Sequence, residues 1–456
     1  MGKVTRKKAS LPETLCYGLG DIGAQFCWSF MSAYVTMYYT DNVGIVGAVA
    51  GTMMLIARLF DGISDVLFAA LIDRCHMKLG KVRPWFMISA PLLGIGLYAS
   101  FHVPHGLGEQ AKIIYIFITY TFVAAVAFTI YNLAFSAILP LMTLDADNRN
   151  AVATFGRFAT RFGITVINYV TPILLAMWGG EKNTGAWNNI STLYAVLCTV
   201  LVFMMGVVIQ EKEFTEVGNV AESTEKVQAD KGSFIENLKV VLSTKYTWLL
   251  IILFTVFYFN SGTMAARAYY YRVVLGDLSL FSVGSMLATL PSLFLLPMMP
   301  YIFKKVEQRK AILISMAIYI AASVFWTIVP RNVTVAYACT VIIGLAWTPL
   351  LAVLFVFVAD VDDYILLKQK KHVEHVVGMT SSIGTKIGTG LGSAVIGWGL
   401  SMFGYIGTQE IQTTGAETGI IGLTTVLPII GAVIIMIIIA LFDVNKQKAK
   451  LLEENQ

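Results

Sequence analysis

Long apolar runs, separated by short polar breaks, recur along the whole chain. A helix that crosses the hydrocarbon core of a bilayer needs about 20 predominantly apolar residues, and these runs reach that length. The pattern predicts twelve membrane-spanning helices, at residues 12–40, 46–72, 84–103, 113–142, 150–178, 190–210, 245–274, 280–302, 310–329, 333–359, 374–404 and 419–443. The predicted fold class is therefore an all-α membrane protein, with lipid rather than water around most of its surface.

The composition and the positions of the basic residues support this prediction. Of the 456 residues, 57% are hydrophobic and 13% are charged, whereas soluble domains have roughly 45–50% apolar and 25% charged residues. Most of the 33 lysines and arginines lie at the two termini and in the loops at 73–83, 143–149, 211–244, 303–309 and 360–373. Because loops rich in lysine and arginine stay in the cytoplasm, we expect both termini there and a location in a bacterial plasma (inner) membrane.

The longest polar stretch, residues 211–243, follows the sixth predicted helix. It is too charged to span a membrane, and we interpret it as a cytoplasmic linker between two halves. The predicted domains are an N-terminal six-helix bundle at 1–210, which contains a cation site, and a C-terminal six-helix bundle at 244–456. Two equal halves joined by a cytoplasmic linker are the layout of the major facilitator superfamily.

Three ionisable residues lie deep inside the second predicted helix. Arg58, Asp61 and Asp65 are spaced i, i+3 and i+7, which places them on one helix face. At this depth a charged side chain is costly unless it faces a partner or a cavity. Two carboxylates one turn apart, with the Ser64 hydroxyl nearby, suit a sodium ion or a shared proton. The alternative is a structural salt bridge between Arg58 and Asp61, which would leave Asp65 without a basic partner.

Other polar residues within the predicted helices form stripes on single faces. The expected substrate-binding residues are Asp21, Gln25, Trp28, Asn132, Ser136, Arg157, Arg161, Arg267, Ser382 and Lys386. Such faces cannot all point at lipid, so we expect them to line a cavity between the halves. Hydrogen-bonding groups and a tryptophan suit a polyhydroxylated or zwitterionic ligand. For Thr129 or Ser136 taken alone, a role in helix packing is the alternative.

The sequence has no nucleophile elbow, phosphate loop or zinc motif. His372, Glu374 and His375 cluster in a predicted cytoplasmic loop, without a third convincing ligand, so we expect no metal site. No selectivity loop of a channel is visible either. We therefore predict a transporter rather than an enzyme. Its expected partners are a small polar solute, the lipid bilayer and a coupling Na+ or H+, with no cofactor and no nucleic acid.

Several short motifs resemble those of one transporter family. They are YGLGDIG at 17–23, MYYTDNVG at 37–44, ARLFDGISD at 57–65, GKVRPW at 80–85, YYYRVVLGD at 269–277 and ADVDDY at 359–364. Their order and spacing are similar to those of the glycoside-pentoside-hexuronide cation symporters, the melibiose permease-like members of the major facilitator superfamily. The resemblance spans essentially the whole chain and implies cation-coupled sugar transport on a twelve-helix fold.

The resemblance also implies roles for individual residues. The cation site would consist of Asp61, Asp65, Thr129 and Ser64, the last of which replaces an asparagine of melibiose permease. By the same resemblance, Lys386 is linked to both the cation and the sugar sites, and Arg157 belongs to the sugar pocket. The implied gating residues on the cytoplasmic side are Asp360, Asp363, Tyr364 and Glu374.

The sugar pocket departs from that of melibiose permease. Gln25 and Asn132 stand where melibiose permease has two acidic residues, and Ser136 replaces its stacking tryptophan. An α-galactoside is therefore not the expected substrate.

The balance of intramembrane charge suggests another class of substrate. The acids are Asp21, Asp61 and Asp65, and the deeper bases are Arg58, Arg157, Arg161, Arg267 and Lys386. An anionic ligand would balance the surplus of about two positive charges, because unpaired buried charge is costly. We predict an acidic sugar, such as a hexuronide (a glucuronide) or a sulfonated sugar. The alternatives are a neutral pentoside or β-glycoside, a lysolipid carrier, and a membrane sensor or scaffold built on a transporter fold.

Overall fold

The computed structural model describes residues 8–74, 77, 79–104, 106–143, 145–212, 234–263, 265–371 and 373–454. Most of the predicted linker, at 213–233, and His372 lie outside these residues, as does the side chain of Glu374. Within the described residues the chain is helical, and it crosses from one end of the molecule to the other twelve times.

The first six crossings form one group, which we call the N-half. They are α1 (Leu11–Met37) with η1 (Tyr38–Asn42); α2 (Gly47–Arg74); α3 (Arg83–Phe101); α4 (Glu109–Phe122) with η2 (Val123–Ala127) and α5 (Phe128–Met142); α6 (Ala146–Met177); and α7 (Thr184–Val208). The start of α1 follows from its sequence, because Ser10 and Glu13 form a reciprocal capping box. Asp145 caps α6, and its hydrogen bond from the Asn148 N–H holds the pKa of this carboxyl below its ordinary value.

The last six crossings form the C-half. They are α10 (Lys245–Gly262) with α11 (Ala265–Tyr269) and η3 (Tyr270–Val274); α12 (Leu280–Leu295) with η4 (Leu296–Met298) and α13 (Met299–Lys305); α14 (Gln308–Ile328); α15 (Val333–Val353) with α16 (Val356–Gln369); α17 (Glu374–Met402); and α18 (Thr414–Ile421) with η5 (Gly422–Val426) and α19 (Leu427–Leu441). Two further helices, α9 (Phe234–Leu242) and α20 (Val444–Glu454), precede and follow this group.

The prediction of a loop at 360–373 is wrong. Helix α16 continues to Gln369, so the ADVDDY motif at 359–364 is helical, and the helix ends where Lys370 adopts a left-handed φ of 54°. A scan for apolar runs ended the crossing at residue 359 because the residues beyond it are charged. Polarity marks where the helix leaves lipid, which is not where its backbone hydrogen bonds stop. Helices α9 and α20 were missed for the same reason.

Nine of the crossings are long and apolar enough to span a membrane by length and composition. Among the described helices, the three crossings that do not meet this criterion contain α1, α2 and α17. These helices carry the charged or polar positions Asp21, Arg58, Asp61, Asp65 and Lys386. The polarity that weakens their apolar signal is therefore concentrated in helices that must face protein rather than lipid.

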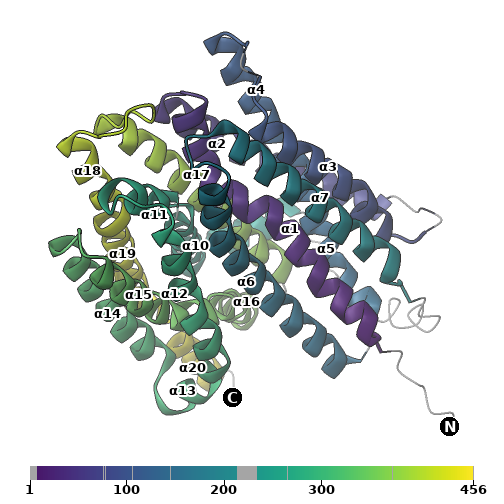
Figure 1. Cartoon of the computed structure of the whole chain (residues 1–456). Coiled ribbons are helices and arrows are strands. Elements are labelled where there is room, and N and C mark those ends of the chain that lie inside the picture. Colours follow the sequence, from purple (N-terminus) through teal and green to yellow (C-terminus); the bar gives the residue numbers. More distant parts are fainter. Residues whose placement is uncertain are drawn as a thin grey trace.

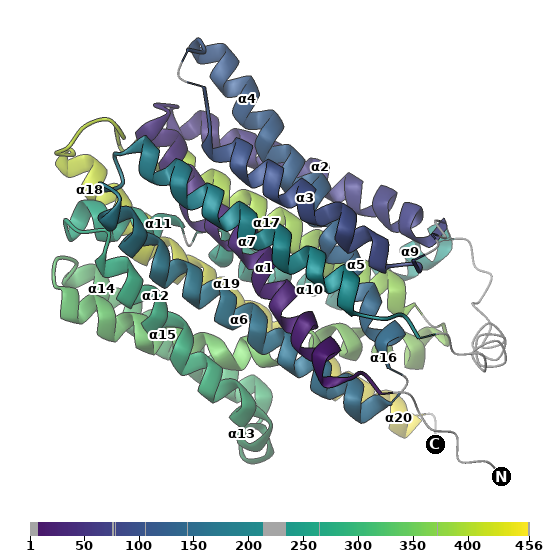
Figure 2. The same ribbon diagram turned by 45° about the vertical axis from the view of Figure 1, so that its right-hand side comes forward.

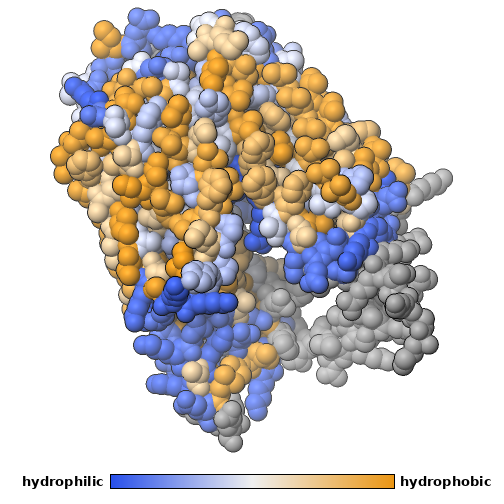
Figure 3. Space-filling model, turned by 60° about the horizontal axis from the view of Figure 1, so that its bottom comes forward, coloured by the Kyte–Doolittle hydropathy of each residue, from blue (hydrophilic) through white to orange (hydrophobic). Residues whose placement is uncertain are grey.

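The two halves meet along α2 and α17, which lie side by side (Figures 1 and 2). We call the end of the molecule where both termini lie the terminal end, and the opposite end the distal end. From the middle to the distal end, α2 and α17 remain in contact, and α6 packs against α12. Towards the terminal end the halves diverge in Figure 1, and Figure 3 shows a hollow between them with hydrophilic residues at its rim.

Small residues allow α2 and α17 to approach closely at the distal end. A Cβ atom added to Gly51 would lie 2.7 Å from the carbonyl oxygen of Ala394, and one added to Gly47 would lie 2.8 Å from that of Gly397. Polar contacts complete the seam, since Ala48 N–H donates to Ser401 Oγ (2.7 Å). The hydrophobic effect does not drive helices together in lipid, because lipid tails are as apolar as the side chains. Helices in a membrane therefore associate through close packing and hydrogen bonds of this kind.

We predict that Gly51→Ala destabilises the protein although alanine favours a helix. The helix gains roughly 0.5–1 kcal/mol from the substitution, but overpacking against the Ala394 carbonyl costs about 1–3 kcal/mol. The measurement is the apparent melting temperature of purified protein in detergent. Gly422→Ala is the matched control, because a Cβ atom there meets nothing within 4 Å. Equal melting temperatures for the two variants would contradict this account of the seam.

Candidate functional site

The charged residues of α2 face one lysine of α17. Lys386 Nζ lies 2.5 Å from Asp65 Oδ2 and 3.4 Å from Asp61 Oδ2. Arg58 Nη1 lies 4.0 Å from Asp61 Oδ2, and Thr129 of α5 donates a hydrogen bond of 2.8 Å to Asp61 Oδ1. These four ionisable groups therefore form one network that crosses the seam between the halves.

Asp65 is not left without a basic partner, as it would be if a salt bridge between Arg58 and Asp61 were the whole arrangement, because Lys386 reaches it from the other half. The two carboxylates balance the two bases, so the network has no net charge of its own. The Ser64 hydroxyl donates to the Asp61 carbonyl oxygen (3.0 Å) and so satisfies a group of its own helix. The clustered oxygen atoms suit a small hard cation or a proton. A cation that binds between the carboxylates must therefore compete with the ammonium group of Lys386.

Two of the predicted substrate-binding residues on α1 are hydrogen-bonded to protein groups. Asp21 is buried and accepts hydrogen bonds from Tyr131 of α5 (3.0 Å) and from Thr160 of α6. Gln25 is also buried and accepts a hydrogen bond from Ser29 (2.9 Å). In this conformation, Asp21 therefore ties three helices of the N-half together.

Trp28 makes a contact that the sequence pattern did not reveal. Its ring stacks on Phe128 with 4.2 Å between the ring centroids, and the Arg58 guanidinium carbon lies 4.2 Å from the Trp28 ring centroid. This cation–π contact stabilises the positive charge of Arg58, which is buried. It also connects the face of α1 to the charged network on α2.

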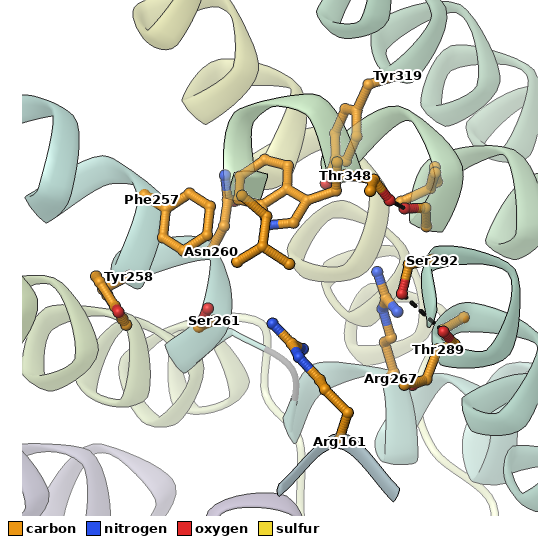
Figure 4. A pocket seen from close by; sticks show the side chains of 15 residues that line it. Arg161, Phe257, Tyr258, Asn260, Ser261, Arg267, Thr289, Ser292, Tyr319 and Thr348 are labelled. Atoms are coloured by element: carbon orange, nitrogen blue, oxygen red, sulfur yellow. Dashed lines mark hydrogen bonds between the residues drawn. The ribbon is translucent and has the colours of Figure 1, made fainter. Parts of the chain in front are cut away.

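A cavity of about 210 Å³ lies beside α6 and among helices of the C-half. Arg161 of α6 and Arg267 of α11 line it, and Figure 4 shows both guanidinium groups directed into it. Further polar lining residues come from α10, α12 and α15: Tyr258, Asn260, Ser261, Thr289, Ser292 and Thr348. The cavity is smaller than the roughly 300–1,000 Å³ of drug-sized ligand sites, so it suits a small solute.

Aromatic rings form another part of the cavity wall. Phe257 stacks on Trp347 with 4.9 Å between ring centroids, and Tyr319 lies 5.5 Å from Trp347. These residues and the hydroxyl groups of the C-half were missed by the sequence analysis because they carry no charge. The available signal was a tryptophan two residues before Pro349 in an otherwise apolar helix, together with isolated serine, threonine and asparagine residues.

The structure does not bring all the predicted substrate-binding residues to this cavity. Asn132, Ser136, Arg157 and Ser382 are exposed in this conformation and are not among its lining residues. Ser136 donates its hydroxyl to the Asn132 carbonyl oxygen (3.0 Å). Among the predicted substrate-binding residues, this cavity thus gathers Arg161 and Arg267.

At the distal end, a network around Arg272 joins the halves. Arg272 of η3 forms ion pairs with Asp41 of η1 and with Glu181 (3.3 Å) in the loop before α7. Tyr405, which follows α17, donates to Asp41 (2.9 Å) and accepts from Arg272 (3.2 Å). The Asp41 side chain is only 1% exposed, so its charge depends on these partners. Both charged groups lie on π-helical turns, which occur frequently at functional sites.

Two weaker contacts accompany the Arg272 network. Thr40 and Tyr269 share a hydrogen bond of 2.8 Å between the halves, and Lys182 pairs with Glu410 (3.1 Å). The side chains of Lys182 and Glu410 are exposed, by 42% and 85%, so their pair contributes little. The distal end is thus closed mainly by the buried contacts.

The predicted gating residues lie at the terminal end, within the C-half. Asp360 and Asp363 of α16 both pair with Lys448 of α20, at 3.0 Å and 2.8 Å. Tyr364 packs edge-on against Tyr246, with 4.9 Å between ring centroids. The side chain of Glu374 lies outside the described residues. Helix α20 therefore holds the acidic motif of α16 in this conformation.

Two helical halves that line a polar cavity and join through charged residues in the membrane define a polytopic solute carrier. The chain belongs to the MFS/sugar transport protein family, whose model matches residues 16–446. This assignment confirms the resemblance to glycoside-pentoside-hexuronide cation symporters at the level of the family. The protein is accordingly a multi-pass membrane transporter and not an enzyme.

Known proteins with a similar sequence or fold support the same assignment. The chain is 26% identical over 450 residues to the isoprimeverose transporter of Lactiplantibacillus pentosus, covering 97% of this chain and 90% of the relative. It is 23% identical to a glucuronide carrier protein homolog of Escherichia coli (strain K12), covering 95% and 93%. A solved bacterial homolog of the human lysosomal transporter Spinster, in an inward-facing and occupied conformation, has a TM-score of 0.67 at 13% identity, covering 97% of both chains. The predicted major facilitator fold is confirmed.

We predict that Arg272→Gln opens the distal end. The substitution leaves the buried Asp41 carboxylate without its cation, and removing one partner of a buried ion pair costs roughly 3–5 kcal/mol. The measurement is the rate at which a maleimide labels Thr40→Cys in a background without other cysteines. This rate should be at least about tenfold higher with Arg272→Gln than with Arg272 in place. Thr40 is 4% exposed in the closed arrangement.

Arg331→Gln is the control for this experiment. Arg331 also forms an ion pair at the distal end, but its partner Glu417 (2.6 Å) belongs to the same half, and Arg331 is 71% exposed. Labelling should therefore stay at the wild-type rate. Equal labelling rates in Arg272→Gln and Arg331→Gln would show that the Arg272 network does not close this end.

Proposed function

We propose that this protein is a cation-coupled symporter that takes up a glycoside, preferentially an acidic one, across a bacterial inner membrane. The observation that carries the proposal is the Lys386 ammonium group, which bridges two carboxylates across the seam between the halves. Family membership supports sugar transport. A sensor or scaffold would have no need of two carboxylates at membrane depth, and a lysolipid carrier is disfavoured by the polar cavity.

The proposed orientation places both termini in the cytoplasm, because basic residues gather at the terminal end. In that orientation the conformation is inward-facing, with the Arg272 network as the periplasmic closure. We propose that 1–210 and 244–456 act as the two bundles that rock about the central site, joined by the linker at 211–243. The described ends of the linker are consistent with this role, since Glu211 accepts hydrogen bonds from the backbone of the N-half turn at Lys81 (2.7 Å).

Coupling follows from competition at the proposed cation site, formed by Asp61, Asp65, Ser64 and Thr129. A sodium ion or a proton that neutralises the carboxylates removes the attraction that holds Lys386 in place. The released ammonium group then turns towards the sugar site, so the cation and the glycoside favour the same state. Lys386 is therefore the proposed link between the cation site and the sugar site.

An acidic glycoside is favoured by the surplus of basic side chains. Arg157, Arg161 and Arg267 form no ion pair with a carboxylate among the residues that the structure describes. The name of the glucuronide carrier protein homolog agrees with an acidic substrate. The alternative, a neutral pentoside or β-glycoside, is supported by the name of the isoprimeverose transporter, since isoprimeverose is an uncharged disaccharide.

The remaining predicted residues keep proposed roles. Asp21, Gln25 and Trp28 on α1 and Asn132 and Ser136 on α5 would contribute hydrogen bonds or stacking once the halves rearrange around a ligand. The same proposal covers Arg157 and Ser382, which are exposed here and would approach the ligand as the terminal end closes. Asp360, Asp363, Tyr364 and Glu374 would then exchange their present partners at the cytoplasmic gate.

We predict that Asp65→Asn abolishes ion-dependent binding. The experiment is a binding screen of neutral and acidic glycosides on purified protein, with sodium, with lithium and at two pH values. In the wild-type protein one of these ions should tighten glycoside binding by about tenfold or more, because both ligands favour one state. In Asp65→Asn that dependence should be lost, since one of the two carboxylates can no longer hold a cation.

The control is Asp277→Asn, which removes one carboxylate from an exposed position in the loop before α12. It should retain the ion dependence of the wild-type protein. Glycoside binding that is independent of sodium, lithium and pH in the wild-type protein would overturn the symporter proposal. Ion dependence that persists in Asp65→Asn would overturn the proposed site while leaving symport intact.

A further inference from the structure

Two arginines from opposite halves line the same cavity. Arg161 comes from α6 of the N-half and Arg267 from α11 of the C-half, and both guanidinium groups point into the same space (Figure 4). Neither forms an ion pair with a carboxylate among the described residues. Two like charges that face one cavity inside a membrane repel each other, and closing the cavity around them is costly. An anion between them would remove this cost.

Other basic residues at membrane depth are arranged differently. Arg58 and Lys386 have carboxylate partners on α2, and Arg272 has two at the distal end. Arg157 has no such partner in the described part of the chain, but it is exposed and can be hydrated. Arg161 and Arg267 combine a position inside the cavity with the lack of a protein counter-charge. This combination indicates that their counter-charge comes from a ligand.

We propose that Arg161 and Arg267 form one seat for the acidic group of the substrate, a carboxylate or a sulfonate, and that the bound group bridges the two halves. The planar fork of a guanidinium group binds such an anion through two parallel hydrogen bonds, so two forks hold it from two sides. This inference rests on the proposed function, because it names where the acidic group of the glycoside lies and what it does there.

The rest of the cavity distinguishes an acidic sugar from an inorganic anion. The ring of Phe257 and that of Trp347 offer an apolar face on which the C–H side of a sugar ring can lie. Ser292 and Thr289, near Arg267, offer oxygen atoms for sugar hydroxyls, and the Ser292 hydroxyl now donates to the Thr289 carbonyl oxygen (2.7 Å). A ligand with an acidic group at one end and a polyhydroxylated ring at the other therefore matches both the arginines and the rest of the cavity wall.

The bridge gives the acidic group a second task besides affinity. An anion between Arg161 and Arg267 turns the repulsion between α6 and α11 into attraction by both to the same group. This draws the halves together at the cavity and favours closure of the terminal end. A neutral glycoside of the same shape fills the space but leaves the repulsion in place. Substrate charge therefore controls closure as well as binding.

The first test compares two probes on the full-length protein in nanodiscs, 4-nitrophenyl β-D-glucuronide and 4-nitrophenyl β-D-glucoside, with sodium at neutral and acidic pH. The wild-type protein should bind the glucuronide about tenfold more tightly or better. Arg161→Gln and Arg267→Gln should each lose most of this preference, and the double variant should bind both probes equally. Lys450→Gln, an exposed lysine of α20, is the control and should keep the preference.

Binding of the glucoside reports whether each variant is folded. If a glutamine variant binds neither probe, Arg161→Lys and Arg267→Lys decide, because lysine keeps the charge but not the fork. A preference for the glucuronide that is reduced but still present supports the seat, and its complete loss overturns it. Equal affinity of the wild-type protein for both probes, or an undiminished preference in the double variant, also overturns it. If the wild-type protein binds neither probe under any of these conditions, the seat fails, and the glycoside panel described above then decides the proposed function separately.

The second test measures the bridge. Spin labels on Asn150→Cys of α6 and Lys304→Cys of α13, in a background without other cysteines, report the separation of the halves at the terminal end, where both residues are exposed. A saturating concentration of the glucuronide should shorten this distance, and saturating glucoside should shorten it less. In the double variant, the two probes should shorten this distance equally. Equal shortening by both probes in the otherwise unmodified protein would overturn the bridge while leaving the seat in place.

Discussion

A charge inside the membrane must have a partner, and in this protein the central partners belong to different halves. Lys386 of α17 lies between Asp61 and Asp65 of α2, so the pairing that makes these residues tolerable in lipid also fixes how the halves meet. The close packing of Gly51 against Ala394 then follows, because the helices must approach closely for the side chains to reach one another. A change at this network therefore acts on the whole molecule.

The two ends of the seam differ in what holds them. At the distal end, Arg272 and Asp41 form a buried pair, whereas at the terminal end the ion pairs of Lys448 stay within the C-half. The halves are therefore tied at one end and separate at the other, as Figures 1 and 3 show. Removing one partner of a buried ion pair strongly destabilises the protein, because a lone charge is left buried. The intact pair nevertheless contributes little net stability, because both charges lose their hydration. Such contacts suit a closure that must open and re-form.

The sequence predicted the charged part of the site better than the uncharged part. Asp61, Asp65 and Lys386 are conspicuous because ionised groups in apolar helices are rare and expensive. The partner of Asp65 was not predictable from the pattern of α2 alone, because Lys386 lies more than 300 residues away in the chain. The network of Arg272 was missed for the same reason. Trp347 and Ser292 lack charge, so neither stands out until the helices are placed around a cavity.

The twelve crossings were predictable because lipid requires long apolar helices. The extension of α16 through 359–369 was not, since charged residues resemble a loop in such a pattern while their backbone remains helical. The proposal of an acidic substrate rests on the lack of protein partners for Arg161 and Arg267, and only the packed structure reveals their surroundings. The fold could therefore be predicted from hydropathy, whereas the surroundings of individual charges could not.

The central claim is that a cation and a glycoside move together. The most direct measurement uses proteoliposomes without any ion gradient, into which a glycoside gradient drives transport while internal 22Na+ and internal pH are both recorded. The account predicts that glycoside entry carries sodium ions or protons inward with it. Glycoside entry at the same rate with neither ion moving would contradict coupling through Asp61, Asp65 and Lys386.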